Sequence, residues 1–387
     1  MKQPVYLDNN ATTPVDERVL QEMLPYFTRN FGNAASRTHV YGWIAEEAVD
    51  HARERVATLI NAHPKEIVFT SGATESVNLA IKGVYEAYSS KGNRIITCVT
   101  EHKAVLDTCR HLEKFGAEIT YLPVKEDGRI NAEILEKSIQ SSTILIAVMY
   151  ANNEIGVIQP VQEIAAIARK HNVLFFCDTA QAAGKIPVDV INDDIPLLSL
   201  SAHKMYGPKG IGALYVRRKD PRVKLIAQMD GGGHENNMRS GTLNVPGIVG
   251  FGKACEICMS EMDSEAKRLS ALRDKLETAL VALNNVSING STEHRLPHVT
   301  NLSFEGATAN TLISALHKSV AVSSGSACTS ALVEPSYVLK ALGLSDERAN
   351  ASLRFGLGRF TSEEDIGMAI EAITGSIKNL RSQSVIN

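Results

Sequence analysis

The sequence predicts an α/β protein with a mainly parallel sheet, helices on both faces of that sheet, and a smaller α+β domain. The first observation is the alternation of short apolar runs with helical segments between residues 66 and 177. Strands separated by helices pair in parallel, and the helices then cover both faces. The second observation is a different alternation after a long helical segment at residues 245–283. A chain of 387 residues is long enough for two such domains.

The first part of the chain supplies the larger domain. A short strand at Tyr6 leads through a polar turn to helices over residues 16–27 and 41–61, whose apolar positions recur at helical spacing. The apolar runs that follow predict strands at residues 66–70, 94–99, 118–122, 143–150, 173–177, 198–200 and 213–216. The helices predicted between them cover residues 76–88, 104–115, 131–138 and 161–170.

The rest of the chain supplies the smaller domain. The helix at residues 245–283 has a charged middle, residues 261–276, which we expect to be partly solvated and to bridge the two domains. The elements predicted after it are strands at residues 299–304, 320–322 and 352–355, helices at 309–316, 336–342 and 362–380, and a loop at 323–334. We assign residues 15–260 to the large domain, and residues 1–14 and 261–387 to the small domain.

Composition and charge exclude several classes of protein. A net charge of −3 leaves no basic excess for nucleic acid or an anionic membrane surface. No stretch approaches eighteen uninterrupted apolar residues, and the first residues lack the apolar core of a signal peptide. We therefore expect a cytoplasmic protein with no membrane segment and no direct nucleic-acid partner. The six cysteines do not form a disulfide framework, and Cys255 and Cys258 fit one packed helix face better than a metal site.

Polar residues cluster directly after the predicted strands, at the edge where a parallel sheet binds its ligands. These groups stand at residues 70–75, 100–102, 152–153, 178–181 and 201–204. Because the carboxyl ends of parallel strands lie at one edge of a sheet, we expect the groups to share one site.

Lys204 is the candidate nucleophile of that site. It lies between Ser201 and a Gly/Pro-rich turn at residues 207–212, just past the end of a strand. A partly desolvated lysine has a lowered pKa and becomes a usable amine nucleophile, as a Schiff-base lysine does. Viewed alone, however, a lysine beside such a turn more often faces water.

The turn at residues 71–74 is a candidate anion site. A glycine-containing turn between a strand and a helix presents free backbone N–H groups and the positive end of the helix dipole, and Thr74 adds a hydroxyl. Neither glycine-rich nucleotide motif is complete here, which argues against a nucleoside triphosphate. Viewed alone, the turn is equally well explained as a plain helix N-cap.

Asp178 completes the set. It is a carboxylate at the end of an apolar run, which is unfavourable unless a cation meets it. Asp178 and Lys204 suit the two poles of a flat cationic heterocycle, with the carboxylate at a pyridinium nitrogen and the lysine bonded to an aldehyde. With a phosphate on the turn at 71–74 and His102 stacked on the ring, the set predicts pyridoxal phosphate as cofactor.

These motifs, in this order, resemble the class V branch of fold-type I pyridoxal-phosphate enzymes. They are residues 70–76 (TSGATES), 100–103 (TEHK), 152–156 (NNEIG), 178–181 (DTAQ), 201–204 (SAHK) and 239–242 (RSGT). Within that branch, residues 323–330 (SSGSACTS), followed by Glu334-Pro335-Ser336, resemble the long cysteine loop of group I cysteine desulfurases, the IscS/NifS type. The resemblance runs from Tyr6 to about Leu380 and implies the fold-type I architecture, with a seven-stranded, mainly parallel sheet in the large domain.

The resemblance also implies site residues. Those for the cofactor are Ala73, Thr74, His102, Asn153, Asp178, Gln181, Ser201, His203, Lys204 and, from the partner subunit of a homodimer, Thr242. Those for the substrate are Asn33, Asn153 and Arg354. Lys204 would bond to the cofactor aldehyde, and Asp178 would pair with the pyridine nitrogen. Arg354 would clamp the substrate carboxylate, which suits a planar fork of donors.

Cys328 has an argument of its own. Apart from this cysteine, residues 323–330 are Ser, Gly, Ala and Thr, so the stretch cannot bury itself and we expect an exposed loop. Free cysteines are usually buried, so a thiol on such a loop indicates function rather than packing. We predict that Cys328 is a nucleophile that attacks the substrate sulfur and carries the product outward.

The function that follows is that of a cysteine desulfurase. By the resemblance, L-cysteine gives L-alanine and a persulfide on Cys328, with Lys204, Cys328 and His102 as catalytic residues and His102 as a proton carrier. The persulfide would pass to an iron–sulfur scaffold protein and to tRNA-thiolation proteins. Through it, Cys328 is also a candidate transient ligand of an iron–sulfur cluster.

Other functions stay open at this point. One is a different class V pyridoxal-phosphate aminotransferase, or a selenocysteine lyase, which the loss of alanine formation in a Cys328→Ser variant would distinguish. Another is a catalytically idle sulfur carrier or scaffold partner, which would lack the absorbance of bound pyridoxal phosphate.

Overall fold

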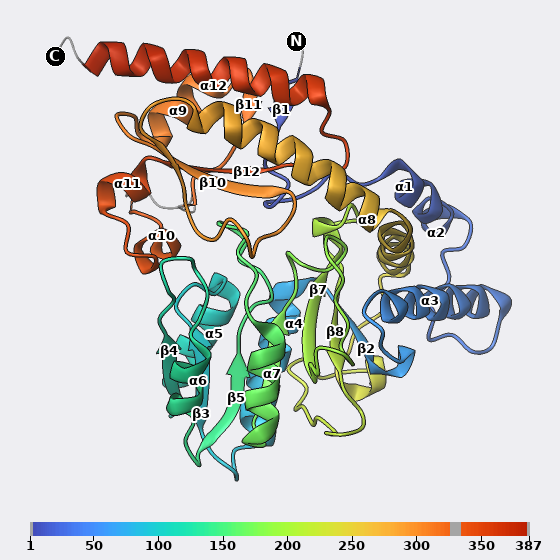
Figure 1. Ribbon diagram of the computed structural model, residues 1–387. Coiled ribbons are helices and arrows are strands. Elements are labelled where there is room, and N and C mark those ends of the chain that lie inside the picture. The colour runs from blue at the N-terminus through green and yellow to red at the C-terminus, as the bar shows by residue number, and fades with distance from the viewer. Residues whose placement is uncertain (1–2, 326–333, 385–387) are drawn as a thin grey trace.

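The computed structural model describes residues 3–325 and 334–384, and a seven-stranded sheet lies at its centre (Figure 1). In spatial order the strands are β2 (Ile67–Thr70), β8 (Gly212–Val216), β7 (Leu197–Ser201), β6 (Leu174–Asp178), β5 (Thr143–Ala147), β3 (Arg94–Cys98) and β4 (Glu118–Leu122). Strand β8 runs antiparallel to both of its neighbours, and all other pairs in this sheet are parallel. The predicted mainly parallel, seven-stranded sheet is confirmed.

Helices cover both faces of this sheet because its strands are apolar on both sides. One face packs against α3 (Val40–Leu59), α6 (Ala132–Ser138), α7 (Val161–Lys170) and the first half of α8 (Val245–Val281). The other face packs against α4 (Ala73–Ala87) and α5 (Lys103–Glu113). Within β6, Phe175 faces the first layer and Phe176 faces the second.

The predicted single helix over residues 16–27 is wrong in one respect. The structure has two helices there, α1 (Glu17–Met23) and α2 (Pro25–Thr28), with Leu24 between them. Pro25 has no N–H to donate and its ring clashes with the preceding turn, so it starts a new helix rather than continuing the old one.

A smaller α+β unit packs over the large sheet. Its elements are the antiparallel strands β12 (Ser352–Gly356), β10 (Val299–Phe304) and β9 (Val286–Ile288), the parallel pair β1 (Val5–Tyr6) and β11 (Val320–Ala321), and the helices α9 (Ala309–Leu316), α10 (Tyr337–Ala341), α11 (Asp346–Asn350) and α12 (Glu363–Ser384). Val5 and Leu7 belong to the core of this unit. The first residues of the chain therefore complete a unit built mostly from its last third.

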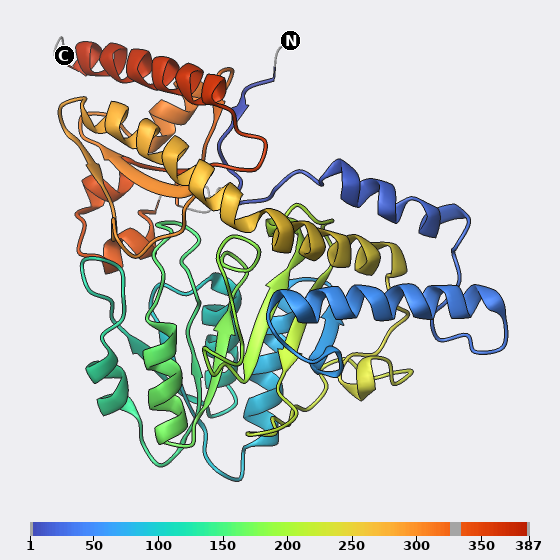
Figure 2. The same cartoon turned by 45° about the vertical axis from the view of Figure 1, so that its right-hand side comes forward.

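Helix α8 connects the two cores, as Figure 2 shows. Phe251 and Cys255 in its first half are buried with the large sheet, whereas Leu269 and Leu276 in its second half are buried with the smaller one. The predicted bridging helix is thus present. The domain boundary proposed at residues 260 and 261 falls inside this helix and stays a prediction.

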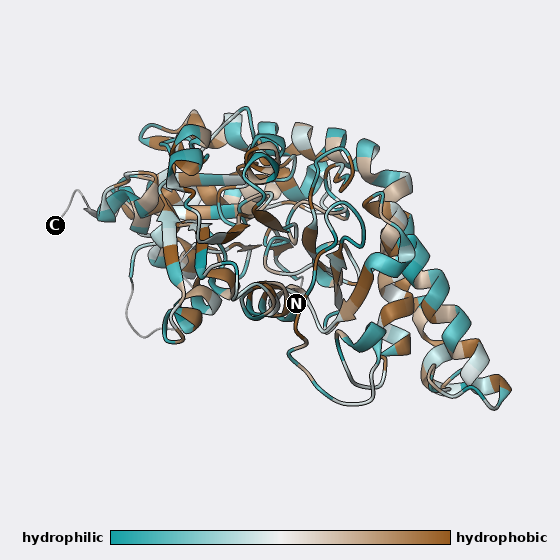
Figure 3. Ribbon diagram, turned by 90° about the horizontal axis from the view of Figure 1, so that it is seen from below, coloured by the Kyte–Doolittle hydropathy of each residue, from teal (hydrophilic) through white to brown (hydrophobic). Residues whose placement is uncertain are grey.

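Apolar residues gather in the central strands, while the surrounding helices carry both apolar and polar residues (Figure 3). Two short elements, β9 and α11, were not predicted, because each is too short for its hydrophobic spacing to be recognised. Three short 3₁₀ turns, η1 (Pro64–Glu66), η2 (Ala202–Lys204) and η3 (Glu235–Asn237), complete the elements. Within the described part of the chain, no helix is both long and apolar enough to cross a membrane.

Candidate active site

A cavity of about 750 Å³ lies at the carboxyl ends of the parallel strands, under the smaller unit. The predicted site residues that line it are Ala73, Thr74, His102, Asn153, Asp178, Gln181, Ser201, His203, Lys204 and Arg354. A somewhat larger cavity, of about 890 Å³, opens at the opposite edge of the sheet and contains none of these residues. The first cavity is the candidate site because the titratable and amide side chains converge there.

Lys204 enters this cavity from the turn that follows β7. Its Nζ atom donates hydrogen bonds to the backbone carbonyls of Asn10 (2.5 Å) and Ala11 (2.7 Å). Burial, reinforced by the positive charge of Arg354, lowers the pKa of the Lys204 amine to about 8. About a tenth of this amine is therefore neutral at pH 7, which supplies the form that a nucleophile or a base requires.

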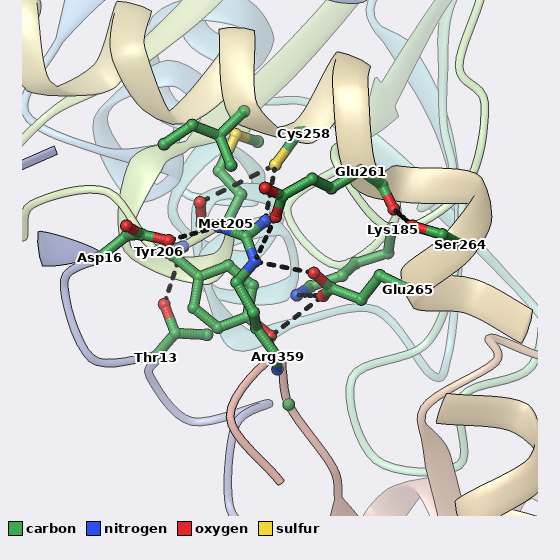
Figure 4. A network of polar contacts seen from close by, with 12 residues as sticks. Thr13, Asp16, Lys185, Met205, Tyr206, Cys258, Glu261, Ser264, Glu265 and Arg359 are labelled. Carbon is green, nitrogen blue, oxygen red and sulfur yellow. Dashed lines mark hydrogen bonds and ion pairs between the residues drawn. The ribbon is translucent and has the colours of Figure 1, made fainter. Parts of the chain in front are cut away.

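Tyr206 fixes the turn that carries Lys204 (Figure 4). Its φ of 64° lies in the left-handed region, and its N–H donates to the hydroxyl of Thr13 at 2.9 Å. Two cations contact the ring, with Lys185 Nζ at 4.0 Å and the Arg359 guanidinium at 4.2 Å from the ring centroid. These contacts hold a strained backbone conformation two residues from Lys204.

Arg359 joins distant parts of the chain in the same network (Figure 4). It pairs with Asp16 at 2.8 Å and with Glu265 of α8 at 2.8 Å, and all three side chains are buried. Removing one partner from such a buried pair leaves an uncompensated charge and typically costs about 3–5 kcal/mol. The network therefore ties the N-terminal segment, α8 and the segment after β12 to the Lys204 turn.

Asp178 ends β6 and is buried. Its Oδ1 atom accepts hydrogen bonds from the Ser199 hydroxyl (2.8 Å) and from the Ala180 N–H (3.0 Å). These two donors fix the orientation of the carboxylate at the cavity wall. A buried carboxylate held in this way is suited to a cationic N–H group of a ligand.

The turn before α4, the predicted anion site, lines the cavity. Gly72 is the N-cap of α4 with φ of 151° and supplies no side-chain cap to the helix. The first N–H groups of a helix without such a cap are donors for an anion. Ser201 and His203 line the same cavity. Burial and the positive charges of Lys204 and Lys209 lower the pKa of His203 to about 4, so this side chain is neutral at pH 7.

His102 caps the start of α5. Its Nδ1 atom accepts a hydrogen bond from the Ala104 N–H at 3.1 Å. Because Nδ1 is an acceptor, the neutral ring carries its proton on Nε2. The free side of the ring therefore holds a transferable proton at a known atom.

Arg354 lies in β12 and reaches the cavity from the smaller unit. Its Nη1 atom donates to the Asn153 carbonyl at 2.9 Å, and its Nη2 atom pairs with Asp8 at 2.6 Å. Its buried Nε atom and the buried Oδ1 atom of Asn153 have no hydrogen-bond partner among the described residues. Buried polar groups need partners, so these atoms are available to a bound ligand.

Three predicted site residues do not join this cavity within the described chain. Asn33 is exposed, and its Oδ1 atom accepts the Ala35 N–H at 2.9 Å. Thr242 is also exposed and does not line the cavity. Cys328 lies outside the described residues. Their roles stay predictions.

Sequence reasoning missed the N-terminal wall of the site. Asn10, Ala11 and Thr12 line the cavity, and the carbonyls of the first two accept the Lys204 amine. Thr12 Oγ1 lies 3.1 Å from His203 Nδ1. The available signal was the polar run Asp8–Thr13 directly after a strand, which is the same pattern that marked the other groups.

The chemistry of this donor set fits the predicted cofactor. A lysine amine with a lowered pKa can react with an aldehyde, and a buried carboxylate can pair with a pyridinium nitrogen. The uncapped N-terminus of a helix can bind a phosphate. The unpartnered amide oxygen of Asn153 adds a polar contact on the cavity wall. Groups of three or more His, Cys, Asp or Glu side chains that could hold a metal ion are absent from the described residues.

Comparison with known proteins gives a consistent picture. The family described as aminotransferase class V matches residues 5–368. A cysteine desulfurase IscS from Anaeromyxobacter sp. (strain Fw109-5) is 57% identical over 385 residues, which cover 99% of this chain and 95% of that protein. A cysteine desulfurase IscS from Colwellia psychrerythraea is 55% identical over 386 residues, with the same coverage of 99% and 95%.

Solved structures agree. A structure titled NifS-like protein has a TM-score of 0.90 at 37% identity, covering 98% of this chain and 99% of that one. A structure titled SspA in complex with cysteine has a TM-score of 0.81 at 36% identity, covering 93% of this chain and 100% of that one.

Proposed function

We propose individual roles for the site residues from the premise that this chain belongs to the class V aminotransferase family and is a pyridoxal-phosphate-dependent cysteine desulfurase. Its substrate is L-cysteine, and it delivers sulfur to acceptors. We base these roles on one observation: Lys204, Asp178 and Arg354 line the same cavity. The Lys204 amine has a lowered pKa, the Asp178 carboxylate is buried, and the Arg354 guanidinium offers a planar set of donors.

The cofactor would be held at its two ends and at its ring. Asp178 would bind the pyridine nitrogen, and Asn153 and Gln181 would lie near the ring hydroxyl. The phosphate would be held by Ala73, Thr74, Ser201 and His203, with Thr242 from a partner subunit. When bound, pyridoxal phosphate acts as an electron sink that stabilises negative charge at the substrate Cα.

The protein side chains would then orient the substrate and move its protons. Arg354 would bind the carboxylate of L-cysteine, with Asn153 and Asn33 as further contacts. Lys204, with its amine pKa near 8, would remove the Cα proton. The proton that His102 carries on Nε2 would serve the substrate thiol.

Cys328 would take the sulfur. Its thiolate attacks the sulfur of L-cysteine, an S–S bond forms, and the C–S bond breaks with its electron pair retained on carbon. Protonation of that carbon fragment completes L-alanine, so L-cysteine and a thiol become L-alanine and a persulfide. The other five cysteines are buried, and burial raises the pKa of every one of these thiols, so they are poor nucleophiles.

The experiment that tests this function uses the purified enzyme loaded with pyridoxal phosphate. After a single addition of L-cysteine, we expect equal amounts of L-alanine and of persulfide, with the added sulfur on the peptide that contains Cys328. Alanine without persulfide, or pyruvate in place of alanine, would support a different class V activity. A selenocysteine lyase would instead turn over L-selenocysteine and leave L-cysteine unchanged.

The depressed pKa of Lys204 predicts how the apoprotein captures its cofactor with changing pH. Only the neutral amine attacks an aldehyde, so the capture rate should rise with pH, reach half of its maximum near pH 8 and then level off. At pH 7 an amine of pKa 8 is neutral about 300 times more often than one of pKa 10.5. Stopped-flow absorbance during reconstitution measures this midpoint. A midpoint above 10 would contradict the prediction, and an Arg354→Gln variant should shift it upward.

The assembly and the partners stay proposals. Several large apolar side chains on and around α1, α2 and α3 are exposed, namely Leu24, Phe27, Phe31, Val40, Tyr41 and Trp43. Apolar surface of this kind supports a homodimer, which would also explain why Thr242 lies outside the cavity of its own chain. An iron–sulfur scaffold protein and tRNA-thiolation proteins as acceptors, a transient iron–sulfur cluster on Cys328 and a cytoplasmic location stay predictions.

A further inference from the structure

We propose that Glu154 is a positioning residue for the sulfur-transfer step, because its carboxyl group contacts the described chain on both sides of the segment that carries Cys328: it accepts a hydrogen bond from Ser336 and packs closely against Gly325. This inference rests on the proposed role of Cys328. Glu154 is not a site residue by the sequence motifs, and it does not line the cavity that contains Lys204.

The carboxyl group of Glu154 is buried and rigidly placed. Glu154 is 2% exposed. The backbone on either side is held, because the Glu154 N–H donates to Asn152 Oδ1 at 2.8 Å and the Glu154 carbonyl accepts from Asn301 at 3.3 Å. The preceding residue, Asn153, accepts from Arg354. Glu154 is therefore fixed to the wall of the active site.

One oxygen of this carboxyl group holds the end of the segment. Glu154 Oε2 accepts a hydrogen bond from the Ser336 hydroxyl at 2.8 Å. The same hydroxyl accepts the Leu339 N–H at 3.3 Å and so caps α10. Nearby, the Tyr337 hydroxyl donates to the Glu101 carbonyl at 2.7 Å. The chain after residue 333 is thereby attached to the large unit.

The other oxygen meets the start of the segment. A Cβ atom at Gly325 would lie 1.6 Å from Glu154 Oε1, so only glycine permits this approach. Oε1 is buried and has no hydrogen-bond partner among the described residues. The backbone just before Gly325 is also held, since the Arg354 N–H donates to the Ser323 carbonyl at 2.8 Å.

The position of Gly325 bears on where Cys328 can act. Cys328 follows Gly325 by three residues, which span at most about 11 Å of extended chain, so a displacement of Gly325 would shift the region that the Cys328 thiol can reach. Gly325 itself lines the cavity that contains Lys204. Holding a nucleophile near its target reduces the entropy lost on approach, so losing the anchor should slow sulfur attack and spare the earlier proton transfer.

The experiment compares two steps in Glu154→Ala, Ser336→Ala and wild type. Exchange of the Cα hydrogen of L-cysteine with deuterium oxide reports on Lys204, and alanine formation reports on Cys328. We expect Glu154→Ala to form alanine about 10–100 times more slowly, while exchange stays within about two-fold of wild type. Ser336→Ala should show a smaller loss of the same kind. Glu334→Ala, which removes an exposed carboxylate of the same segment, is the matched control and should match wild type.

The outcomes separate cleanly. Alanine formation at the wild-type rate in Glu154→Ala would overturn the inference. An equal loss of Cα hydrogen exchange would also overturn it, because Glu154 would then act by holding the neighbouring Asn153 in the active site. If Glu154→Ala does not fold, Glu154→Gln and Ser336→Ala are compared with wild type instead. The glutamine oxygen can still accept a hydrogen bond from Ser336. Glu154→Gln should therefore retain more alanine formation than Ser336→Ala. A Cys328→Ser variant that still forms alanine would instead refute the role of Cys328 itself.

Discussion

Replacing Lys204 with alanine is expected to lower alanine formation from L-cysteine by about 10⁴-fold or more, because the variant loses both the covalent attachment of the cofactor and the base for the Cα proton. Among the described residues, the other lysine that lines the cavity, Lys209, is exposed. The pKa of the Lys204 amine is depressed by burial and by Arg354, and its Nζ atom is held by the carbonyls of Asn10 and Ala11. Another side chain could not take over both tasks from the same place.

Reduction with borohydride followed by peptide mass analysis measures the loss of covalent cofactor attachment directly. Wild type should carry the reduced cofactor on the peptide that contains Lys204, and the variant should carry none. Lys209→Ala is the matched control, because Lys209 also lines the cavity but is exposed. It should keep the attached cofactor. Addition of a small primary amine should restore part of the proton exchange in Lys204→Ala, whereas undiminished turnover without it would refute the assignment.

Replacing Cys328 with serine is expected to lower alanine formation by at least about 10³-fold, because a serine hydroxyl remains protonated at neutral pH and is a far weaker nucleophile than a thiolate. The absorbance of bound pyridoxal phosphate and the exchange of the substrate Cα hydrogen should persist, since neither needs this thiol. The result would separate the chemistry at Lys204 from the transfer of sulfur.

A second cysteine variant provides the control. Cys109 is buried in α5, and burial raises the pKa of its thiol to about 12. Cys109→Ala should therefore keep alanine formation and lose only stability, by about 1 kcal/mol for the small cavity it leaves. If Cys328→Ser retained alanine formation and Cys109→Ala lost it, the sulfur-accepting thiol would have been misassigned.

Much of the fold and of the site could be predicted because the relevant signals are local. Alternating apolar runs and helical segments predicted the parallel sheet, and polar residues after each strand predicted its functional edge. Lys204, Asp178 and Arg354 do line one cavity. Hydrophobic periodicity predicted one continuous helix over residues 16–27. It could not predict that Pro25 divides this helix in two.

The fold class, the groups at the strand ends and the family can all be predicted from the amino-acid sequence, because they depend on spacing along the chain and on motifs of a few neighbouring residues. The folded chain was needed to show which carbonyls accept hydrogen bonds from the Lys204 amine, which carboxylate pairs with Arg354, and that Glu154 contacts both Gly325 and Ser336. Asp8 and Arg354 are 346 positions apart, and Glu154 and Ser336 are 182 apart. Contacts across such distances leave no periodic trace in the sequence, because they arise only when two packed units meet.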